Sequence, residues 1–272
     1  MSAPTWIEAN GVALRYQLSG AGRPRTLVLV HELGGSLDSW TGLVELLPDD
    51  LRVLRYDLRG AGLSEKVSGT VGLDQMCDDL QALIAALGID GPAVVLGAAA
   101  GGAIAVRFAN RFPDLCSRLV LVGPALGVPT ERHAAALAIA DRLDAEGLRA
   151  IAADVLPKAF PKALWQSAAD RLVAEARWLG ADPQGYAAAY RMLAEADVRA
   201  ELPILACPVL ALAGRYDPFG TPEIVERAVA AIPDVRFAVV EGGHFMSVQS
   251  PARVAEAIIP FIAPASRKGA GR

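Results

Sequence analysis

The chain has 272 residues, of which 53% are hydrophobic and 21% charged, a composition typical of a globular protein with a large core. Its formal net charge of −4 offers no basic surface, so nucleic acid is not expected as a partner. The three cysteines cannot build a disulfide framework, and neither a signal peptide nor a run of about 20 apolar residues is found. We therefore expect a cytoplasmic protein without a membrane partner, made of one large domain or of a domain with an insertion.

The first half of the chain alternates between predicted strands and helices. Short apolar segments on either side of Asn10-Gly11 favour a β-hairpin over residues 7–16. The run TLVLV at 26–30 is typical of a strand that is buried on both faces. Further strands are predicted at 52–56, 93–96 and 119–122, and helices at 40–47, 73–87 and 100–112.

The pattern changes after residue 127. Residues 129–202 contain only alanine-rich amphipathic helices, which we expect to be broken at Gly147, Pro157, Pro161 and Pro183. Strands at 209–213 and 237–240 then alternate with helices at 222–232 and from 251 onwards, and the polar tail 266–272 is expected to fray. This order predicts an α/β fold with a doubly wound, mostly parallel sheet. Its core comprises 1–127 and 203–272, and a helical lid is inserted over 128–202.

One loop of the predicted core has the form of a catalytic motif that lacks its reactive residue. Gly97-Ala98-Ala99-Ala100-Gly101 joins a buried strand directly to a helix of small residues. This arrangement of glycines is that of the nucleophile elbow of a hydrolase, G-x-S-x-G. Ala99 stands in the position of the nucleophile and offers no hydroxyl, thiol or carboxylate.

Five motifs in a fixed order resemble the α/β-hydrolase family, and in particular its lidded subgroup of 3-oxoadipate enol-lactonases and C–C bond hydrolases. The resemblance covers residues 7–263, and its motifs are HELGG at 31–35, DLRGAGLS at 57–64, GAAAG at 97–101, GRYD at 214–217 and GGHF at 242–245. It implies a hydrolase or C–C lyase whose catalytic acid is Asp217 and whose base is His244. A carboxylate on one ring nitrogen would fix the tautomer of His244 and leave the other nitrogen as the base.

The resemblance also implies an oxyanion hole made by the backbone N–H groups of Ala100 and Leu33. Because these donors belong to the backbone, the absence of a serine at position 99 does not remove them. Glu32 is a second departure, since many relatives have glycine at this point. A carboxylate facing the oxyanion would oppose its stabilisation unless it were protonated or paired with a cation, whereas one facing solvent would be neutral. Both orientations remain open.

The lid is expected to cover the pocket and to set specificity. Its bulky apolar residues are Trp165, Trp178, Tyr186, Tyr190 and Met192. Arg177 and Arg191 are candidates to bind a substrate carboxylate, although each could equally belong to a solvated helix face. No residues have metal-ligand spacing, and GAG at 60–62 lacks the rest of a dinucleotide fingerprint, so neither a metal nor another cofactor is expected.

Other polar residues are interpreted as structural. Ser36 and Ser247 are expected to serve as turn or capping hydroxyls, and His31 to orient its loop. His133 lies in the lid and is expected to be exposed. Cys207, which precedes Pro208 and a buried strand, is interpreted as a packed thiol.

Three functions fit these observations. In the first, an enzyme acts on a small carbonyl or carboxylate metabolite through His244 and Asp217 as acid and base, without a covalent intermediate, in ester, lactone or C–C cleavage or in lyase chemistry. In the second, an ordinary serine hydrolase of the enol-lactonase or esterase type has alanine in place of its nucleophile. In the third, the protein binds a ligand without turnover. Retention of both His244 and Asp217 favours an enzyme with a small-molecule substrate, and the second departure at Glu32 favours altered chemistry.

Overall fold

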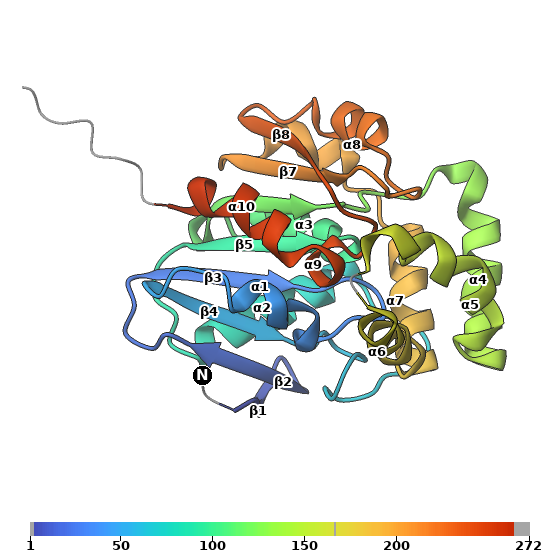
Figure 1. Ribbon diagram of the computed structural model, residues 1–272. Coiled ribbons are helices and arrows are strands. Elements are labelled where there is room, and N and C mark those ends of the chain that lie inside the picture. Colours follow the sequence, from blue (N-terminus) through green and yellow to red (C-terminus); the bar gives the residue numbers. More distant parts are fainter. Residues whose placement is uncertain (1–2, 166, 264–272) are drawn as a thin grey trace, which may run out of the picture.

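The computed structural model describes residues 3–165 and 167–263, so the tail 266–272 lies outside the described residues. A sheet of eight strands runs through its centre in the order β1-β2-β4-β3-β5-β6-β7-β8 (Figure 1). The strands are β1 (Thr5–Ala9), β2 (Val12–Ser19), β3 (Arg25–Val30), β4 (Leu51–Tyr56), β5 (Ala93–Ala98), β6 (Cys116–Val122), β7 (Val209–Gly214) and β8 (Val235–Val240). β2 pairs antiparallel with β1 and β4, and all other neighbours are parallel, which confirms the predicted mostly parallel sheet.

The predicted hairpin is formed by β1 and β2. Asn10 and Gly11 connect the two strands with φ angles of 52° and 67°. Two successive positive φ angles are required by a type I′ turn, and asparagine followed by glycine adopts them at the least energetic cost.

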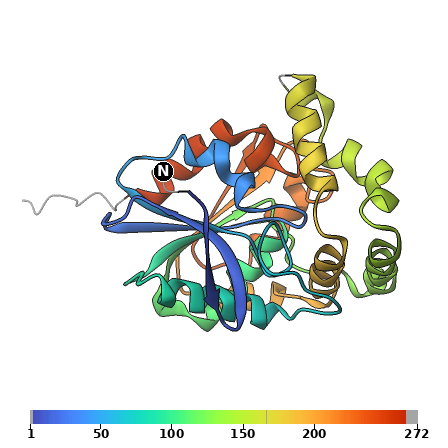
Figure 2. The same ribbon diagram turned by 90° about the horizontal axis from the view of Figure 1, so that it is seen from below.

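Helices cover both faces of the sheet (Figure 2). One face carries α2 (Leu73–Ala86), α3 (Ala100–Arg111) and α8 (Pro222–Val229), and the other carries α1 (Thr41–Val44) and α10 (Pro251–Ile262). Alternate residues of β3 serve the two layers: Val28 and Val30 pack with α2 and α3, whereas Leu27 and Leu29 pack with α1 and α10. Because a strand points successive side chains to opposite faces, burial on both sides requires the uninterrupted apolar run.

The predicted helix over 40–47 is shorter than expected. A 3-10 turn, Leu37–Trp40, leads into α1, which ends at Val44. Ser36 caps this turn by accepting a hydrogen bond from the backbone N–H of Asp38 at 3.2 Å. The capping role expected for Ser36 is confirmed.

The residues between β6 and β7 form a helical block beyond the carboxyl ends of the parallel strands (Figure 1). Its helices are α4 (His133–Glu146), α5 (Arg149–Ala159), α6 (Ala168–Leu179) and α7 (Pro183–Glu195). α4 ends before Gly147, and Pro183 is the first residue of α7. The break predicted at Pro157 is wrong, because this proline lies inside α5, which continues to Ala159 despite the loss of one backbone hydrogen bond. Among the described residues, no helix is long and apolar enough to cross a membrane.

Candidate active site

The elbow between β5 and α3 is formed although its nucleophile is absent. Ala99 has φ 45° and ψ −115°, a conformation that L-residues rarely adopt. Three hydrogen bonds hold it there: its N–H donates to the Val122 carbonyl at 3.0 Å, and its carbonyl accepts from Gly102 at 2.9 Å and from Ala125 at 3.0 Å. Strain of this kind persists where the surrounding structure enforces it and is concentrated at functional sites.

The glycines of the motif are required by close backbone contacts. A Cβ atom at Gly97 would lie 2.2 Å from the Gly101 carbonyl oxygen, and one at Gly101 would lie 2.3 Å from the Val30 carbonyl oxygen. A side chain at Gly97 would therefore force β5 away from the start of α3, and one at Gly101 would force α3 away from the end of β3. The motif G-x-x-x-G at 97–101 is thus a packing requirement of the strand-to-helix turn.

His244 and Asp217 form a hydrogen-bonded pair. His244 Nδ1 lies 3.0 Å from Asp217 Oδ2, and the Asp217 side chain is completely buried. Asp217 Oδ1 accepts from the backbone N–H groups of Phe219 and Gly220 at 2.8 and 3.2 Å, so both carboxylate oxygens are held. The carboxylate favours the Nδ1–H tautomer of His244 and leaves Nε2 free to accept a proton.

A cavity of about 360 Å³ opens beside this pair. His244, Phe219 and Phe245 form one part of its wall, together with Leu33 and with Ala125, whose N–H is bonded to the Ala99 carbonyl. The helical block between β6 and β7, called the lid below, borders the cavity with largely apolar side chains, among them Ile139, Ile151, Val155, Tyr186, Tyr190 and Leu193. The cavity therefore lies between the lid and the core, next to the elbow.

Two backbone N–H groups remain unpaired, one at the elbow and one in the loop after β3. Within the described part of the chain, the N–H groups of Ala100 and Leu33 have no hydrogen-bond partner. Ala100 is the first residue of α3, so its N–H also carries the positive end of the helix dipole. Such donors favour a negatively charged oxygen nearby, as an oxyanion hole requires.

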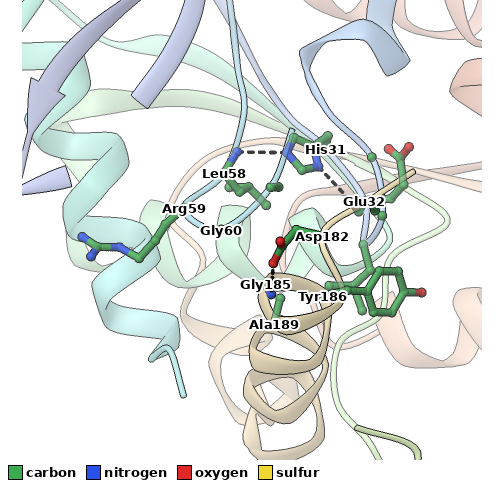
Figure 3. A pocket seen from close by; sticks show the side chains of 14 residues that line it. His31, Glu32, Leu58, Arg59, Gly60, Asp182, Gly185, Tyr186 and Ala189 are labelled. Carbon is green, nitrogen blue, oxygen red and sulfur yellow. Dashed lines mark hydrogen bonds between the residues drawn. The ribbon is translucent and has the colours of Figure 1, made fainter. Parts of the chain in front are cut away.

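Glu32 takes neither of the orientations considered from the sequence. Its side chain is buried, with 4% of the residue exposed, and Ser39 Oγ donates to its Oε1 at 2.7 Å. Glu32 does not line the His244 cavity but two smaller cavities elsewhere along the same loop. The carboxylate points away from the ring of Tyr186 (Figure 3). It therefore faces neither solvent nor the expected oxyanion position.

His31 uses both ring nitrogens within the protein. Leu58 N–H donates to Nε2 at 2.9 Å, so the proton is on Nδ1, which donates to the Glu32 carbonyl at 2.7 Å (Figure 3). His31 thereby ties the loop after β3 to the loop after β4. This is the loop-orienting role that the sequence suggested.

Of the aromatic residues expected to bind substrate, the tyrosines line the cavity and the tryptophans do not. Burial raises the pKa of Tyr186 and Tyr190, so both hydroxyls stay neutral. Trp178 is buried edge-on against Tyr186 at a centroid distance of 5.8 Å, and Trp165 stacks on Phe160 at 5.7 Å. The tryptophans belong to the core of the lid because their rings pack between its helices.

The arginines expected to hold a substrate carboxylate do not line the cavity either. Arg191 donates to Asp141 at 2.8 Å and also to Asp144, so its charge is neutralised inside the lid. Arg177 is exposed and borders one of the small cavities beside Glu32. The charged lid residues that do line the His244 cavity are Arg142 and Asp154. Neither was predicted, because no pattern in alanine-rich helices shows which face meets the cavity.

His133 is half-buried rather than exposed, and its Nε2–H donates a hydrogen bond of 2.8 Å to the Val128 carbonyl. Over the residues described, no group of three or more His, Cys, Asp or Glu side chains could hold a metal ion.

The chain is similar in sequence and in fold to known hydrolases. A family model described as alpha/beta hydrolase fold matches residues 25–157. 3-Oxoadipate enol-lactonase 2 of Acinetobacter baylyi is 28% identical over 246 residues, which cover 90% of this chain and 91% of that protein. A thermophilic esterase from Thermogutta terrifontis, solved with malate bound, is 30% identical with a TM-score of 0.88, covering 96% of this chain and 98% of that chain. The enol-lactonase from Burkholderia xenovorans is 27% identical with a TM-score of 0.88, and the match covers 95% of this chain and 99% of that chain.

Proposed function

Because the chain belongs to the α/β-hydrolase family, we propose that it hydrolyses a small ester or lactone by direct attack of water, without a covalent intermediate. One observation carries this proposal: the hydrogen-bonded pair of His244 and Asp217 stands beside an elbow whose central residue is an alanine. A methyl group cannot take up an acyl group, so the base is left to activate water.

The proposed reaction begins with the substrate carbonyl carbon next to Ala99 and its oxygen between the N–H groups of Ala100 and Leu33. His244 Nε2 removes a proton from water while the water oxygen attacks the carbonyl carbon. The buried carboxylate of Asp217 stabilises the imidazolium that forms. When the tetrahedral intermediate collapses, the bond to the leaving oxygen breaks and His244 returns the proton to that oxygen.

The substrate class rests on the relatives and on the cavity. The relatives described above are named as enol-lactonases and an esterase, which favours cleavage of an ester or lactone C–O bond over C–C cleavage. A cavity of about 360 Å³ with mainly aliphatic and aromatic walls suits a compact substrate with an apolar part.

The test compares hydrolysis of p-nitrophenyl acetate and of small lactones by the unmodified protein and by three variants. His244→Ala is expected to abolish turnover, and Asp217→Asn to lower it by about 10²-fold or more. His133→Ala is the matched control, because this half-buried histidine lies on α4 and does not line the cavity. Full turnover by His244→Ala would contradict the proposal.

A quenched-flow mass measurement separates direct attack by water from covalent catalysis. The unmodified protein is expected to show no acylated species during turnover, since position 99 offers no acceptor. Accumulation of an acyl-protein would overturn the mechanism, and the modified peptide would identify the nucleophile. Ligand binding without turnover of any substrate would instead support the third function, in which the protein binds a ligand and catalyses no reaction.

A further inference from the structure

Two cysteines that are far apart in the sequence meet at the amino ends of neighbouring strands. Cys116 is the first residue of β6, and Cys207 lies two residues before β7. Their Sγ atoms are 4.0 Å apart. The third cysteine, Cys77 on α2, is buried and directs its thiol at the Ile104 carbonyl at 3.5 Å.

The pairing of β6 with β7 brings the two cysteines beside each other. Leu119 lies opposite Val209 in the parallel ladder, and the Leu119 N–H donates to the Pro208 carbonyl at 3.0 Å. Cys116 and Cys207 lie just before these paired residues on adjacent segments of the chain, with their Sγ atoms 4.0 Å apart. Each sulfur needs to move by only about 1 Å to reach bonding distance, which rotation of the unbranched side chains allows.

The two thiols differ in access and in acidity. Cys116 is buried, with 5% exposed, whereas Cys207 is only half-buried. The Cys116 thiol donates towards Cys207 and so lowers the pKa of Cys207, against the opposing effects of burial and of the nearby Asp234 carboxylate. The same contact, together with burial, raises the pKa of Cys116. Cys207 is therefore the thiol that an outside reagent meets first.

We propose that Cys116 and Cys207 are a site of reversible oxidation, at which a low-molecular-weight disulfide such as oxidised glutathione generates an intramolecular disulfide bond. In the first step the Cys207 thiolate attacks one sulfur of the glutathione disulfide, forms a mixed disulfide and releases one glutathione thiolate. In the second step Cys116, after losing its proton to solvent, attacks the Cys207 sulfur and releases the second glutathione. Overall, two protein thiols are oxidised to a disulfide and one glutathione disulfide is reduced to two glutathione molecules.

The bond would close a chain loop that contains β6 and the whole lid, since the two residues are 91 positions apart. The pair lies at the amino ends of the parallel strands, whereas the His244 cavity lies beyond their carboxyl ends. We therefore expect the bond to restrict the unfolded chain and to leave catalysis unchanged. A loop of this length predicts an increase in melting temperature on the order of 5–10 °C.

The test incubates the folded protein with oxidised glutathione under non-denaturing conditions, followed by intact mass measurement and peptide mapping without reduction. The expected product has lost about 2 Da and yields one cross-linked peptide that contains Cys116 and Cys207. Cys77→Ser is the matched control and should give the same product, because burial raises the pKa of Cys77 to about 12 and leaves it unreactive. Cys116→Ser should instead retain glutathione as a mixed disulfide on Cys207.

Thermal unfolding with and without dithiothreitol measures the stabilisation by the disulfide independently of catalysis. The oxidised protein should melt higher, and reduction should restore the original melting temperature. A protein that remains fully reduced after incubation, a cross-link that involves Cys77, or a Cys116→Ser variant with the same mass loss would each overturn the proposal.

Discussion

Glu32 Oε1 accepts a hydrogen bond of 2.7 Å from Ser39 Oγ, and this bond fixes the carboxylate away from the His244 cavity. Gly35 allows the arrangement, since a Cβ atom there would lie 2.5 Å from Glu32 Oε1. The carboxylate is thus part of the packing of the loop that carries the Leu33 N–H. Its presence does not by itself require a redesigned reaction.

Glu32→Gln is therefore expected to have little effect on catalysis. Glutamine keeps the size of the side chain and an oxygen that accepts from Ser39. We expect kcat and KM for p-nitrophenyl acetate to change by less than about 5-fold, because a true general acid or base contributes about 10²-fold or more. A loss of that larger size, with normal thermal stability, would show that Glu32 takes part in proton transfer.

Ala99→Gly should stabilise the fold. The φ angle of 45° at this position strains any residue with a Cβ atom, and glycine removes that strain. The greater freedom of glycine in the unfolded chain offsets part of the gain, which leaves a net increase of about 1 kcal/mol in the free energy of unfolding. Urea denaturation measures this change in the free energy of unfolding. Ala98→Gly is the control, because Ala98 lies in the extended backbone of β5 and its replacement by glycine should destabilise the fold. Equal losses in both variants would contradict strain at Ala99.

Ala99→Ser should convert the site to covalent catalysis. The elbow, the His244–Asp217 pair and the two free backbone N–H groups are all in place without the hydroxyl. We expect labelling by a fluorophosphonate at residue 99 and an acyl-protein after rapid quenching with p-nitrophenyl acetate. The double variant Ala99→Ser with His244→Ala is the control and should not be labelled. Absence of labelling in the single variant would mean that His244 does not reach position 99.

Arg142→Gln should weaken binding of acidic substrates selectively. Arg142 lines the His244 cavity, and its guanidinium donates to the Ala150 carbonyl at 2.8 Å at the exposed edge of the lid. We expect KM for a substrate with a free carboxylate to rise by up to about 5-fold, since exposed charge pairs contribute at most ~1 kcal/mol. KM for the corresponding neutral ester should not change. Arg191→Gln is the control, and an equal effect there would refute the assignment to Arg142.

Much of the fold could be predicted because its signals are local. The uninterrupted apolar run of β3 follows from burial on both faces, and Asn10-Gly11 follows from the φ angles of the hairpin turn. The positions of helix ends were predicted less accurately. Pro157 lies inside α5, so the loss of one backbone hydrogen bond does not end the helix at this proline.

The sequence by itself determined the elbow with its missing nucleophile and the pairing of Asp217 with His244, because each depends on motifs at the ends of strands that must meet at one edge of the sheet. Only the tertiary structure decided the side chains around them. Glu32 accepts a hydrogen bond from Ser39 and Arg191 donates one to Asp141, and no local sequence pattern predicts either partner. The contact of Cys116 with Cys207 arose in the same way, from the pairing of strands separated by the entire lid. Backbone patterns are set over a few residues, whereas the direction of a polar side chain depends on which group the folded chain places within its reach.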